Sequence, residues 1–453
     1  MSKPFRRAIC WVRRDLRLRD HAVLALATQN SEEVAVAFVF DQNILDTLED
    51  RDDRRVSFIH ASLEEMDVKL RRVGSKMVVL HGDPVEEIPR LAEVIGAEAV
   101  FTARDAEPYA QERDRAVTEA LAEKGRAFES VKDTVVFEGS EMPDEPHPEF
   151  ERRWRERLIP ERDLFYHKAD RTSLMPAADL PDTDWTLAQI GFEPTDLIIA
   201  AGEDAARTRL RTFLPKLQNY RRDRHRPALS GTSGLSVDLR FGAISVRECV
   251  RAALANPSPG TEKWLTELIW RDYYHADLFH HPKRSQCAAS ELARPSHGVA
   301  WREGRTGFPL IDAAMRCLRA TGTMHNRLRM VAASFFVNDL LLDPAEGEAW
   351  FARYLLDFDL ASNRGNWRWC AGADASYRPR MNAVLQSERY DPDGSFILRW
   401  VPEIKGLIGP ALHFPPRATP LELEAAGLTL GEDYPWPIVD RAAQRQRAQD
   451  SLL

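Results

Sequence analysis

The first 139 residues combine two patterns of apolar and polar positions. Short apolar, β-branched runs predict strands at Ala8–Val12, Val34–Phe40, Met77–Leu80, Ala99–Thr102 and Val131–Phe137. Amphipathic stretches lie between these runs, and Val56–Leu70 carries apolar residues near helical spacing. Strands that alternate with helices predict βαβ units. We therefore expect an α/β N-terminal domain built on a doubly wound parallel sheet, which binds ligands at the carboxyl ends of its strands.

The chain from residue 140 to residue 201 interrupts this pattern. It is rich in Asp and Glu, and its prolines are Pro143, Pro146, Pro148, Pro160, Pro176, Pro181 and Pro194. Proline ends helices and cannot donate a hydrogen bond to a sheet. We predict a long interdomain linker with short helical pieces.

From residue 202 to residue 453 strand patterns almost disappear. Helices are predicted over Asp204–Tyr220, Val246–Ala255, Lys263–His280, Leu310–Ala320, Asn326–Leu342 and Glu346–Leu356. The third region is therefore expected to be an all-α domain.

Length and composition agree with this division. A chain of 453 residues has room for two domains and a linker, and 44% hydrophobic with 29% charged residues is typical of a globular protein. No apolar run approaches the roughly 18 residues of a membrane span. The basic start, Met1–Ile9, lacks an apolar segment with a cleavage site. We expect a cytoplasmic protein without a membrane partner.

Net charge does not decide whether the chain binds nucleic acid. The formal charge of −8 argues against it. Basic residues cluster locally, however, at Arg221, Arg222, Arg224 and Arg226 and at Arg378 and Arg380.

Cysteine spacing excludes two kinds of site. The five cysteines, Cys10, Cys249, Cys287, Cys317 and Cys370, form no CxxC pair. A disulfide framework and a zinc or iron–sulfur site are therefore not expected, and we predict buried free thiols. The chain also lacks a GxGxxG motif, so NAD is not indicated.

Small polar residues form the first candidate site. The loop after Tyr220 contains Gly231, Thr232, Ser233, Gly234, Leu235 and Ser236 and precedes a predicted helix. Hydroxyl groups and glycine-exposed backbone N–H groups can bind a phosphate or pyrophosphate. An ordinary N-capped loop has the same composition, so both interpretations remain open.

A helix face with aromatic and charged side chains is the second candidate. One broad face of the helix predicted over 263–280 carries Trp264, Glu267, Trp270, Arg271 and Tyr274. Aromatic rings offer stacking area, and a carboxylate can bind a base edge, so this face suits a cavity wall. An interfacial ion pair is the alternative.

Two further polar stretches follow. Asn326 and Met330 are i,i+4 neighbours with Arg329 alongside, which places an amide beside a soft thioether. The stretch 357–369 forms a redox-capable polar pocket rather than a core, with Asp357, Asp359, Asn363, Trp367 and Trp369. No second histidine lies at metal-ligand spacing, so no metal is expected.

Taken in this order, these stretches resemble the photolyase/cryptochrome family. The resemblance runs from Trp11–Asp20 to Tyr434–Val439, and its most specific parts are Trp264–Arg271, Gly307–Arg316 and Met324–Met330. It implies an antenna domain at 1–139, an interdomain linker at 140–201 and a helical FAD-binding domain at 202–453.

The resemblance also implies roles for single residues. The FAD-binding positions are Tyr220, Thr232, Ser233, Gly234, Leu235, Ser236, Trp264, Glu267, Arg271, Asn326, Arg329, Asp357, Asp359 and Asn363. An Arg329–Asp357 ion pair would flank the isoalloxazine ring. The substrate and DNA positions are Arg224, Glu267, Trp270, Asn326, Arg327, Met330, Trp369 and Arg380, and the catalytic positions are Glu267, Asn326, Asn363 and Trp367.

The activity implied is light-driven repair of cyclobutane pyrimidine dimers in UV-damaged DNA, by a monomer without an obligate protein partner. Glu267 would stabilise charge on the dimer. Met330 fits cyclobutane dimers, because family members that repair (6-4) lesions carry histidine there, and Asn363 fits repair better than signalling. A (6-4) photolyase and a light receptor without repair activity stay open as alternatives.

Two features depart from the family or leave its pattern open. The family reduces its flavin in light through a relay of three tryptophans, and of these only Trp367 is present. Pro344 replaces the second, and no tryptophan lies near Glu291, where the third is expected. Trp350, Tyr354 and Trp400 could form a detour. Thr323 and Ala383 also replace usual family residues. A second, antenna chromophore would lie near Ala106–Ala110, and folate, deazaflavin and flavin are all compatible with it.

Overall fold

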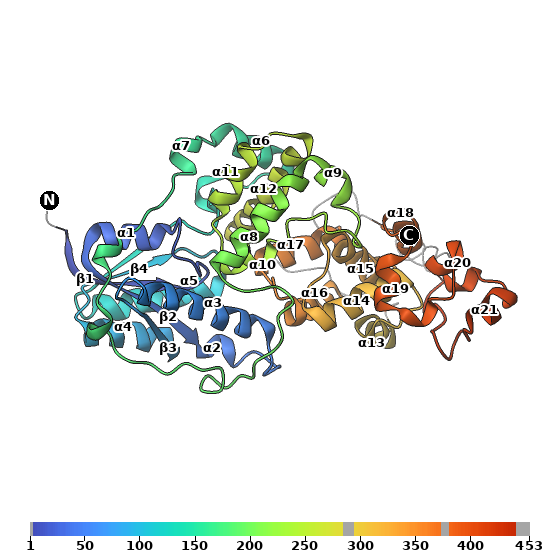
Figure 1. Ribbon diagram of the computed structural model, residues 1–453, viewed down its shortest axis with the longest axis horizontal. Coiled ribbons are helices and arrows are strands. Elements are labelled where there is room, and N and C mark those ends of the chain that lie inside the picture. The colour runs from blue at the N-terminus through green and yellow to red at the C-terminus, as the bar shows by residue number, and fades with distance from the viewer. Residues whose placement is uncertain (1–2, 284–293, 373–379, 441–453) are drawn as a thin grey trace. The chain divides into compact units, whose positions relative to one another are not determined.

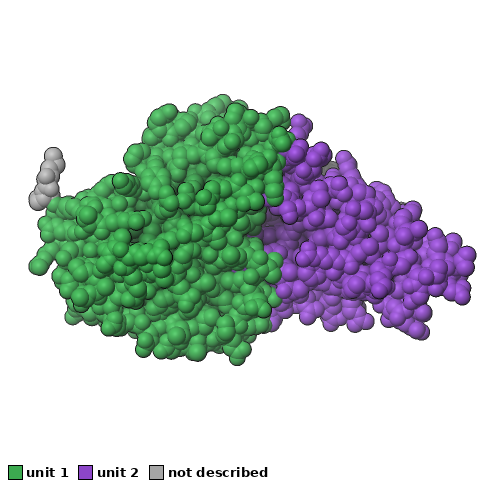
Figure 2. All heavy atoms as spheres, in the orientation of Figure 1, with its two compact units in different colours: residues 1–218, 233–282 green, residues 219–232, 283–453 purple. Residues whose placement is uncertain are grey.

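The computed structural model describes residues 3–283, 294–372 and 380–440 (Figure 1). Cys287, Glu291 and Arg378, which the sequence analysis singled out, lie outside these ranges. The chain forms two compact units: unit 1 comprises Met1–Gln218 and Ser233–Pro282, and unit 2 comprises Asn219–Thr232 and Lys283–Leu453 (Figure 2). These units are defined by the contacts within each of them, so they do not test the predicted domain boundaries after residues 139 and 201, which stay predictions.

Unit 1 contains a five-stranded parallel sheet. Its strands are β1 (Phe5–Val12), β2 (Ser31–Asp41), β3 (Met77–Gly82), β4 (Ala99–Ala103) and β5 (Ala127–Val131). The order is β3-β2-β1-β4-β5, and every neighbouring pair is parallel. The chain therefore winds outward from β1 in both directions, which confirms the predicted doubly wound sheet.

Helices accompany the sheet, namely α1 (Ala22–Asn30), α2 (Gln42–Leu45), α3 (Arg54–Arg71), α4 (Pro84–Ile95) and α5 (Pro108–Ala122). Alternate strand residues such as Ile9, Trp11 and Ala37 share one core with Leu91 of α4 and Val117 of α5. Residues 8–12 of β1 are all buried, so both faces of the strand are covered. This explains why the strands are continuous apolar runs rather than alternating ones.

The fifth predicted strand is wrong in position. The strand ends at Val131, whereas Val135, Val136 and Phe137 are buried outside the sheet. The backbone N–H groups of Val136 and Phe137 donate to the Asp272 carboxylate at 3.0 and 3.2 Å. A side chain therefore satisfies these donors in place of a neighbouring strand, and burial alone gave the run a strand-like pattern.

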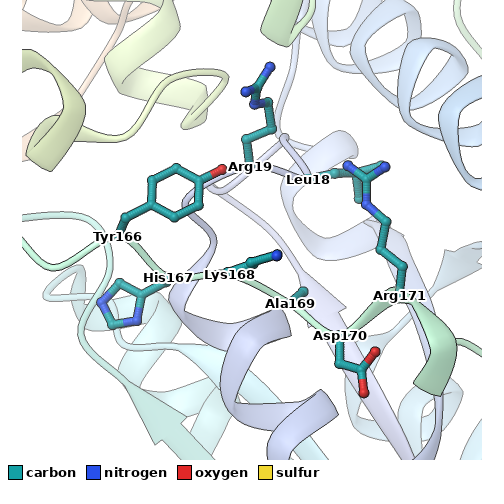
Figure 3. A pocket seen from close by; sticks show the side chains of 8 residues that line it. All are labelled: Leu18, Arg19, Tyr166, His167, Lys168, Ala169, Asp170 and Arg171. Carbon is teal, nitrogen blue, oxygen red and sulfur yellow. The ribbon is translucent and has the colours of Figure 1, made fainter.

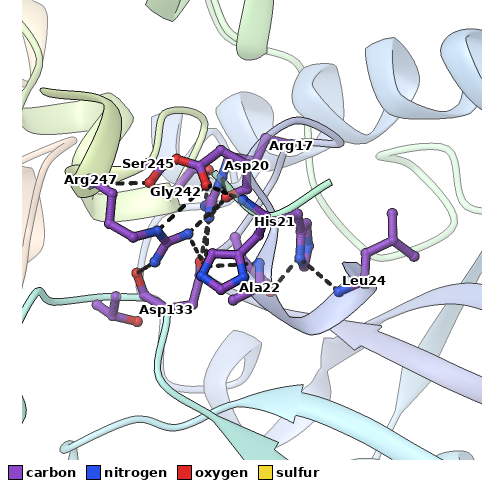
Figure 4. Close-up of polar contacts among 12 residues, drawn as sticks. Arg17, Asp20, His21, Ala22, Leu24, Asp133, Gly242, Ser245 and Arg247 are labelled. Carbon is purple, nitrogen blue, oxygen red and sulfur yellow. Dashed lines mark hydrogen bonds and ion pairs between the residues drawn. The ribbon is translucent and has the colours of Figure 1, made fainter. Parts of the chain in front are cut away.

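A buried charge network follows β1 in unit 1 (Figure 4). Arg17 donates to both carboxylate oxygens of Asp133 at 2.6 and 2.8 Å, and Arg247 donates to the same carboxylate at 2.8 Å. Burial alone would raise the pKa of Asp133, but the guanidinium groups of Arg17 and Arg247 hold it well below its usual range. Paired in this way, the charges fix the loop after β1 to the start of α11 (Val246–Leu254).

The predicted linker contains only short helical pieces. They are η1 (Gly139–Glu141), α6 (His147–Arg157), α7 (Pro160–Asp163), η2 (Arg171–Ser173) and η3 (Ala177–Asp179). Several begin at or next to a proline, where the missing N–H has no helical partner to lose.

Helices make up the described chain beyond residue 202. In unit 1 these helices are α8 (Glu203–Phe213), η4 (Leu214–Asn219, ending in unit 2), α10 (Ser236–Phe241), α11 and α12 (Pro259–His280). In unit 2 they are α9 (Tyr220–Asp223), α13 (Pro295–Glu303), α14 (Pro309–Thr321), α15 (Asn326–Asn338), α16 (Pro344–Tyr354), α17 (Leu360–Ala371), α18 (Ala383–Tyr390), α19 (Ser395–Trp400), η5 (Pro402–Ile404), α20 (Gly409–His413), η6 (Pro415–Arg417) and α21 (Pro420–Ala426). No strand occurs among residues 202–283, 294–372 and 380–440. The predicted all-α region is confirmed over these ranges.

Two predicted helices end early. The α-helix predicted over 204–220 ends at Phe213 and continues as a 3₁₀ helix, because Pro215 has no N–H to continue the α pattern. The helix predicted over 326–342 ends at Asn338. Leu341 has φ +58°, a left-handed conformation that a helix cannot contain.

Three broader predictions concern membranes, metals and thiols. In the described part of the chain no helix is long and apolar enough to cross a membrane. The described residues also contain no group of three His, Cys, Asp or Glu side chains placed to hold a metal. Cys10, Cys249, Cys317 and Cys370 are buried and free, as predicted for these four.

Candidate functional site

A pocket in unit 2 collects polar residues from three consecutive helices and the loop between two of them. Its walls come from α15, α16, α17 and the 355–359 loop, and are formed by Asn326, Arg329, Met330, Ala333, Phe351, Leu355, Asp357, Asp359, Ser362, Asn363, Asn366, Trp367 and Cys370. The third and fourth polar stretches of the sequence analysis thus meet in one place.

An ion pair forms part of one wall of this pocket. Arg329 and Asp357 approach to 2.7 Å, and the Arg329 Nε–H also donates to the Met324 carbonyl at 2.8 Å. The Asp357 side chain is only 4% exposed, so its charge is well shielded from water. The ion pair predicted from the sequence is confirmed, and it places a fixed positive and a fixed negative charge on one wall.

The start of α17 supplies further polar groups. Asp359 caps the helix by accepting a hydrogen bond from the Ser362 N–H at 2.9 Å. The buried Asn363 amide donates to the Glu348 carbonyl of α16 at 3.1 Å, which fixes its side chain. Its amide oxygen has no hydrogen bond among the described residues and can accept one from a bound group.

Trp367 forms the apolar floor. Its ring is buried and packs edge-to-face against Phe351 at 5.1 Å, Phe336 at 5.8 Å and Trp301 at 6.3 Å. A Cβ on Gly347 would lie 2.1 Å from this ring. The helix α16 can therefore pack this closely on Trp367 only because residue 347 is glycine. The Trp367 indole N–H is buried and has no hydrogen-bond partner in the described chain.

The first turn of α15 lies at the rim. The His325 Nδ1 atom caps the helix by accepting from the Arg327 N–H at 3.1 Å. Burial, with the charges of Arg327 and Arg329, lowers the pKa of His325 to about 4. The exposed Asn326 amide lies 4.0 Å from the Met330 sulfur, so the predicted i,i+4 contact is confirmed.

The predicted phosphate-contacting arginines differ in environment. Arg380 is exposed, as is Trp369, another residue predicted to contact substrate. Arg327 is half-buried: its guanidinium lies over the Tyr390 ring at 4.4 Å and 2.7 Å from His225 Nδ1. Arg224 lies over the Tyr220 ring at 5.5 Å. Their role toward DNA stays a prediction.

The loop predicted to bind phosphate is divided between the two units. In unit 2, Tyr220 is buried at the start of α9, and a Cβ on Gly231 would lie 2.6 Å from the Asp223 carbonyl oxygen. Residue 231 must therefore be glycine for the chain to pass Asp223 and reach Thr232.

In unit 1, the segment 233–236 leads into α10. Gly234 has φ +66°, and the Ser233 hydroxyl accepts a hydrogen bond from the Leu235 N–H at 3.4 Å. Leu235 occupies the N-cap position and cannot accept a bond from the helix, so the loop is not an ordinary N-capped one. The first N–H groups of α10 therefore lack a side-chain cap.

The face of α12 separates into two groups. Trp264 is buried against Phe213, with ring centroids 5.1 Å apart. Arg271 donates to the Thr134 carbonyl at 2.6 Å and to the Leu239 carbonyl at 3.3 Å, which joins α12 to the loop after β5 and to α10.

Glu267 and Trp270, by contrast, are half-exposed on α12. Glu267 lies 3.2 Å from Lys263, one turn earlier. Trp270 and Tyr274 are ring neighbours at 5.4 Å. The structure therefore places the residues predicted to contact substrate on the accessible part of the helix.

Two larger hollows lie elsewhere in unit 1. One, of about 830 Å³, lies at the carboxyl ends of β4 and β5 and includes Arg104, Ala106, Gln111, His275 and Phe279. Within the predicted antenna segment, Tyr109 donates its hydroxyl to Asp41 at 2.8 Å.

The other hollow, of about 730 Å³, lies between residues 18–19 and residues 166–171 (Figure 3). Arg19, Lys168 and Arg171 outnumber the single carboxylate of its lining, Asp170, so the lining is basic. That carboxylate accepts hydrogen bonds from Thr172 at 2.7 and 3.0 Å. No sequence motif marks this hollow.

Sequence reasoning missed several neighbours of the candidate residues. Trp301 touches Trp367, His147 stacks on Trp270, and Ser362 and Asn366 line the pocket of unit 2. Ser362, Asn363 and Asn366 share one helix face by their spacing, a signal that could have been used. Trp301 and His147 left no such signal, because only tertiary packing brings them near.

Known proteins resemble the chain along its whole length. Residues 8–161 match the family described as DNA photolyase, and residues 264–452 match the FAD binding domain of DNA photolyase. The chain is 35% identical over 458 residues to deoxyribodipyrimidine photo-lyase of Streptomyces griseus, with 96% of each covered.

Solved structures of photolyases are also similar to the chain over nearly its whole length. A bacterial class III photolyase from Agrobacterium tumefaciens superposes with a TM-score of 0.89 at 30% identity, covering 100% of this chain and 98% of that one. An archaeal photolyase from Sulfolobus tokodaii with two FAD molecules gives a TM-score of 0.83 at 28% identity, covering 98% and 99%.

Proposed function

The chain belongs to the DNA photolyase family, and on that premise we propose that it repairs cyclobutane pyrimidine dimers in UV-damaged DNA with the energy of light. It carries the family's FAD-binding domain. The observation that carries the proposal is the pocket of α15, α16 and α17, in which a charge pair, three amides and Trp367 surround one space next to Met330.

The walls of the unit 2 pocket, whose cavity measures about 60 Å³, match a flavin ring in their chemistry. An isoalloxazine ring is flat, with polar atoms along one edge and an apolar remainder. The Arg329–Asp357 pair and the Asn363 amide supply polar partners, and Phe351 and Trp367 supply apolar surface. The unpaired indole N–H of Trp367 is a buried donor that a bound group could satisfy.

When bound, FAD supplies a light-absorbing one-electron donor. The chain's own residues would bind and orient the DNA lesion. Trp270 presents a flat ring for stacking on an extruded base. Asn326 offers an amide to a base edge, and the Glu267 carboxyl would hydrogen-bond where charge develops.

Met330 favours cyclobutane dimers over (6-4) lesions. A thioether has no proton to donate, so it suits a reaction that needs only an electron. His325 cannot take over as an acid. Its Nδ1 atom is occupied by the Arg327 N–H, and burial lowers its pKa to about 4, so the ring is neutral at neutral pH. This rim of the pocket therefore offers no protonated imidazole to act as an acid at neutral pH.

The experiment compares two lesions. Purified protein with reduced FAD receives duplexes that contain one cyclobutane thymine dimer or one (6-4) product, under equal blue-light doses and in the dark. We expect light-dependent loss of the cyclobutane dimer alone. Repair of the (6-4) product alone would contradict the assignment of Met330, and repair of neither would favour a light receptor.

We also propose that the hollow beside Ala106 holds a second, light-harvesting chromophore. Its volume of about 830 Å³ suits a cofactor-sized ligand, and it lies at the carboxyl ends of β4 and β5. Folate, deazaflavin and flavin all remain compatible. The absorption spectrum of the native protein should contain a band beyond those of one FAD, and a spectrum of one FAD alone would contradict this proposal.

A further inference from the structure

The Trp270 ring of α12 is covered on one face by another ring. The His147 imidazole lies parallel to it, with centroids 3.4 Å apart and planes within 7°. Tyr273 meets both rings edge-on, at 5.3 Å from His147 and 5.5 Å from Trp270. Of these neighbours, only His147 stacks flat on the indole, so it excludes any base from that face.

His147 is held firmly in this position. It begins α6 between Pro146 and Pro148, and proline removes backbone freedom on both sides. One turn later, Glu151 accepts a hydrogen bond from the Thr266 hydroxyl of α12 at 2.8 Å. The helix that carries the imidazole is therefore hydrogen-bonded to the helix that carries Trp270, and the ring stack is part of the packing between α6 and α12.

The imidazole is neutral and holds its place by stacking. Its Nε2 atom is buried without a hydrogen-bond partner among the described residues. Burial lowers the pKa of His147 to about 4, so the ring carries no charge at neutral pH. The contact that remains is the aromatic one, and aromatic pairs orient each other as well as burying area.

We propose that His147 is a positioning residue for DNA-lesion binding: by stacking on one face of Trp270 it fixes the plane of the indole, so that an extruded base meets a ring of fixed orientation. The inference rests on the proposed function, because it assigns to Trp270 a role in holding the dimer. A stacking platform that cannot tilt loses less entropy when a base settles on it.

The test compares two substitutions with a control. His147→Leu removes the flat ring at similar volume, and His147→Phe keeps a flat ring without nitrogen. Phe150→Leu removes a ring of the same helix that packs on Tyr273 instead, with centroids 5.4 Å apart. Binding to dimer-containing and undamaged duplexes, melting temperature, and repair per photon in the saturated complex are measured for all three.

We expect His147→Leu to bind the dimer about threefold to tenfold more weakly, the range expected for one lost aromatic contact. Binding to undamaged DNA and repair in the saturated complex should stay at wild-type values. His147→Phe should restore dimer binding. Phe150→Leu should lower only the melting temperature, which separates positioning from helix stability.

Two results would overturn the inference alone: wild-type dimer preference in His147→Leu, or an equal loss in His147→Phe. A wild-type protein without any preference for dimer-containing DNA would instead overturn the proposed function, and this inference with it. That outcome is visible before any substitution is made, so the two failures are distinct.

Discussion

Glu267 lies where its carboxylate can reach a ligand. It is half-exposed on α12, next to Lys263 at 3.2 Å. We expect Glu267→Ala to retain FAD and to repair fewer dimers per absorbed photon, because a partner for developing charge is lost. Glu267→Gln, which keeps a hydrogen-bonding group of the same size, should be less impaired. Loss of FAD from Glu267→Ala during purification would show that the residue binds the cofactor instead.

Trp301 changes the expectation for electron supply. In the sequence, Pro344 replaces the second relay tryptophan beyond Trp367, and Trp350, Tyr354 and Trp400 could form a detour. In the structure the buried Trp301 ring contacts Trp367 at 6.3 Å, whereas Trp350 pairs with Tyr354 at 4.6 Å. Trp301 is thus an oxidisable ring that directly adjoins Trp367.

We therefore expect Trp301→Phe to slow light-driven reduction of the oxidised protein by an external thiol severalfold, because an electron lost from Trp367 is no longer replaced by its neighbour. Trp350→Phe and Trp400→Phe serve as controls and should react at the wild-type rate. Absorbance during blue-light titration measures the rate, and transient absorption measures the lifetime of the oxidised tryptophan. An unchanged rate in Trp301→Phe would rule out this relay.

Single contacts differed in how far sequence could predict them. Asn326 and Met330 meet because helix geometry fixes i,i+4 neighbours, and the Arg329–Asp357 pair follows from opposite charges with few other partners. The stack of His147 on Trp270 joins distant parts of the chain. Its position depends on how α6 packs on α12, which no local pattern encodes.

At the scale of elements, α15 depends on an unusual cap. His325 accepts from the Arg327 N–H through Nδ1, and a protonated imidazole cannot accept. Its pKa is about 4 in the fold, against about 6.5 in the unfolded chain. The unfolded chain therefore takes up the proton first, and the stability from this group is complete above pH 6.5 and is lost as pH falls toward 4.

We expect His325→Asn, which keeps a capping side chain, to reduce this pH dependence. Between pH 6.5 and 4 the free energy of unfolding should fall less in the variant than in the wild type, by about 1 to 3 kcal/mol. Denaturant unfolding at several pH values measures it. Parallel pH curves for the two proteins would show that His325 does not control the stability of α15.

Strands and helices were predicted well where the pattern was local. The continuous apolar runs of β1 to β4 matched, because both faces of a parallel sheet are buried. The run at Val131–Phe137 failed, because the Asp272 carboxylate satisfies its N–H groups instead of a strand. An apolar run predicts that a segment is buried, but it does not predict which groups accept the hydrogen bonds of its backbone.

For the molecule as a whole, net charge and local charge make opposite predictions. The chain carries −8, yet Arg224, Arg327 and Arg380 are the predicted phosphate contacts. We expect affinity for dimer-containing DNA to fall with salt, with a log–log slope of about −2 to −3 for three contacts. Arg224→Ala should reduce the slope by about 1, whereas Arg6→Ala, at an exposed position in β1, should not. A flat salt dependence in the wild type would contradict a local basic surface.

The central claim is that light, this protein and its FAD together reverse cyclobutane dimers. The most direct measurement is chromatography of an oligonucleotide with one thymine dimer, after graded blue-light doses with the reduced protein and in the dark. We expect recovery of two intact thymines in an uncut strand, in proportion to absorbed photons and absent in the dark. Full FAD occupancy and tight dimer binding, without recovery of thymines in the light, would contradict it.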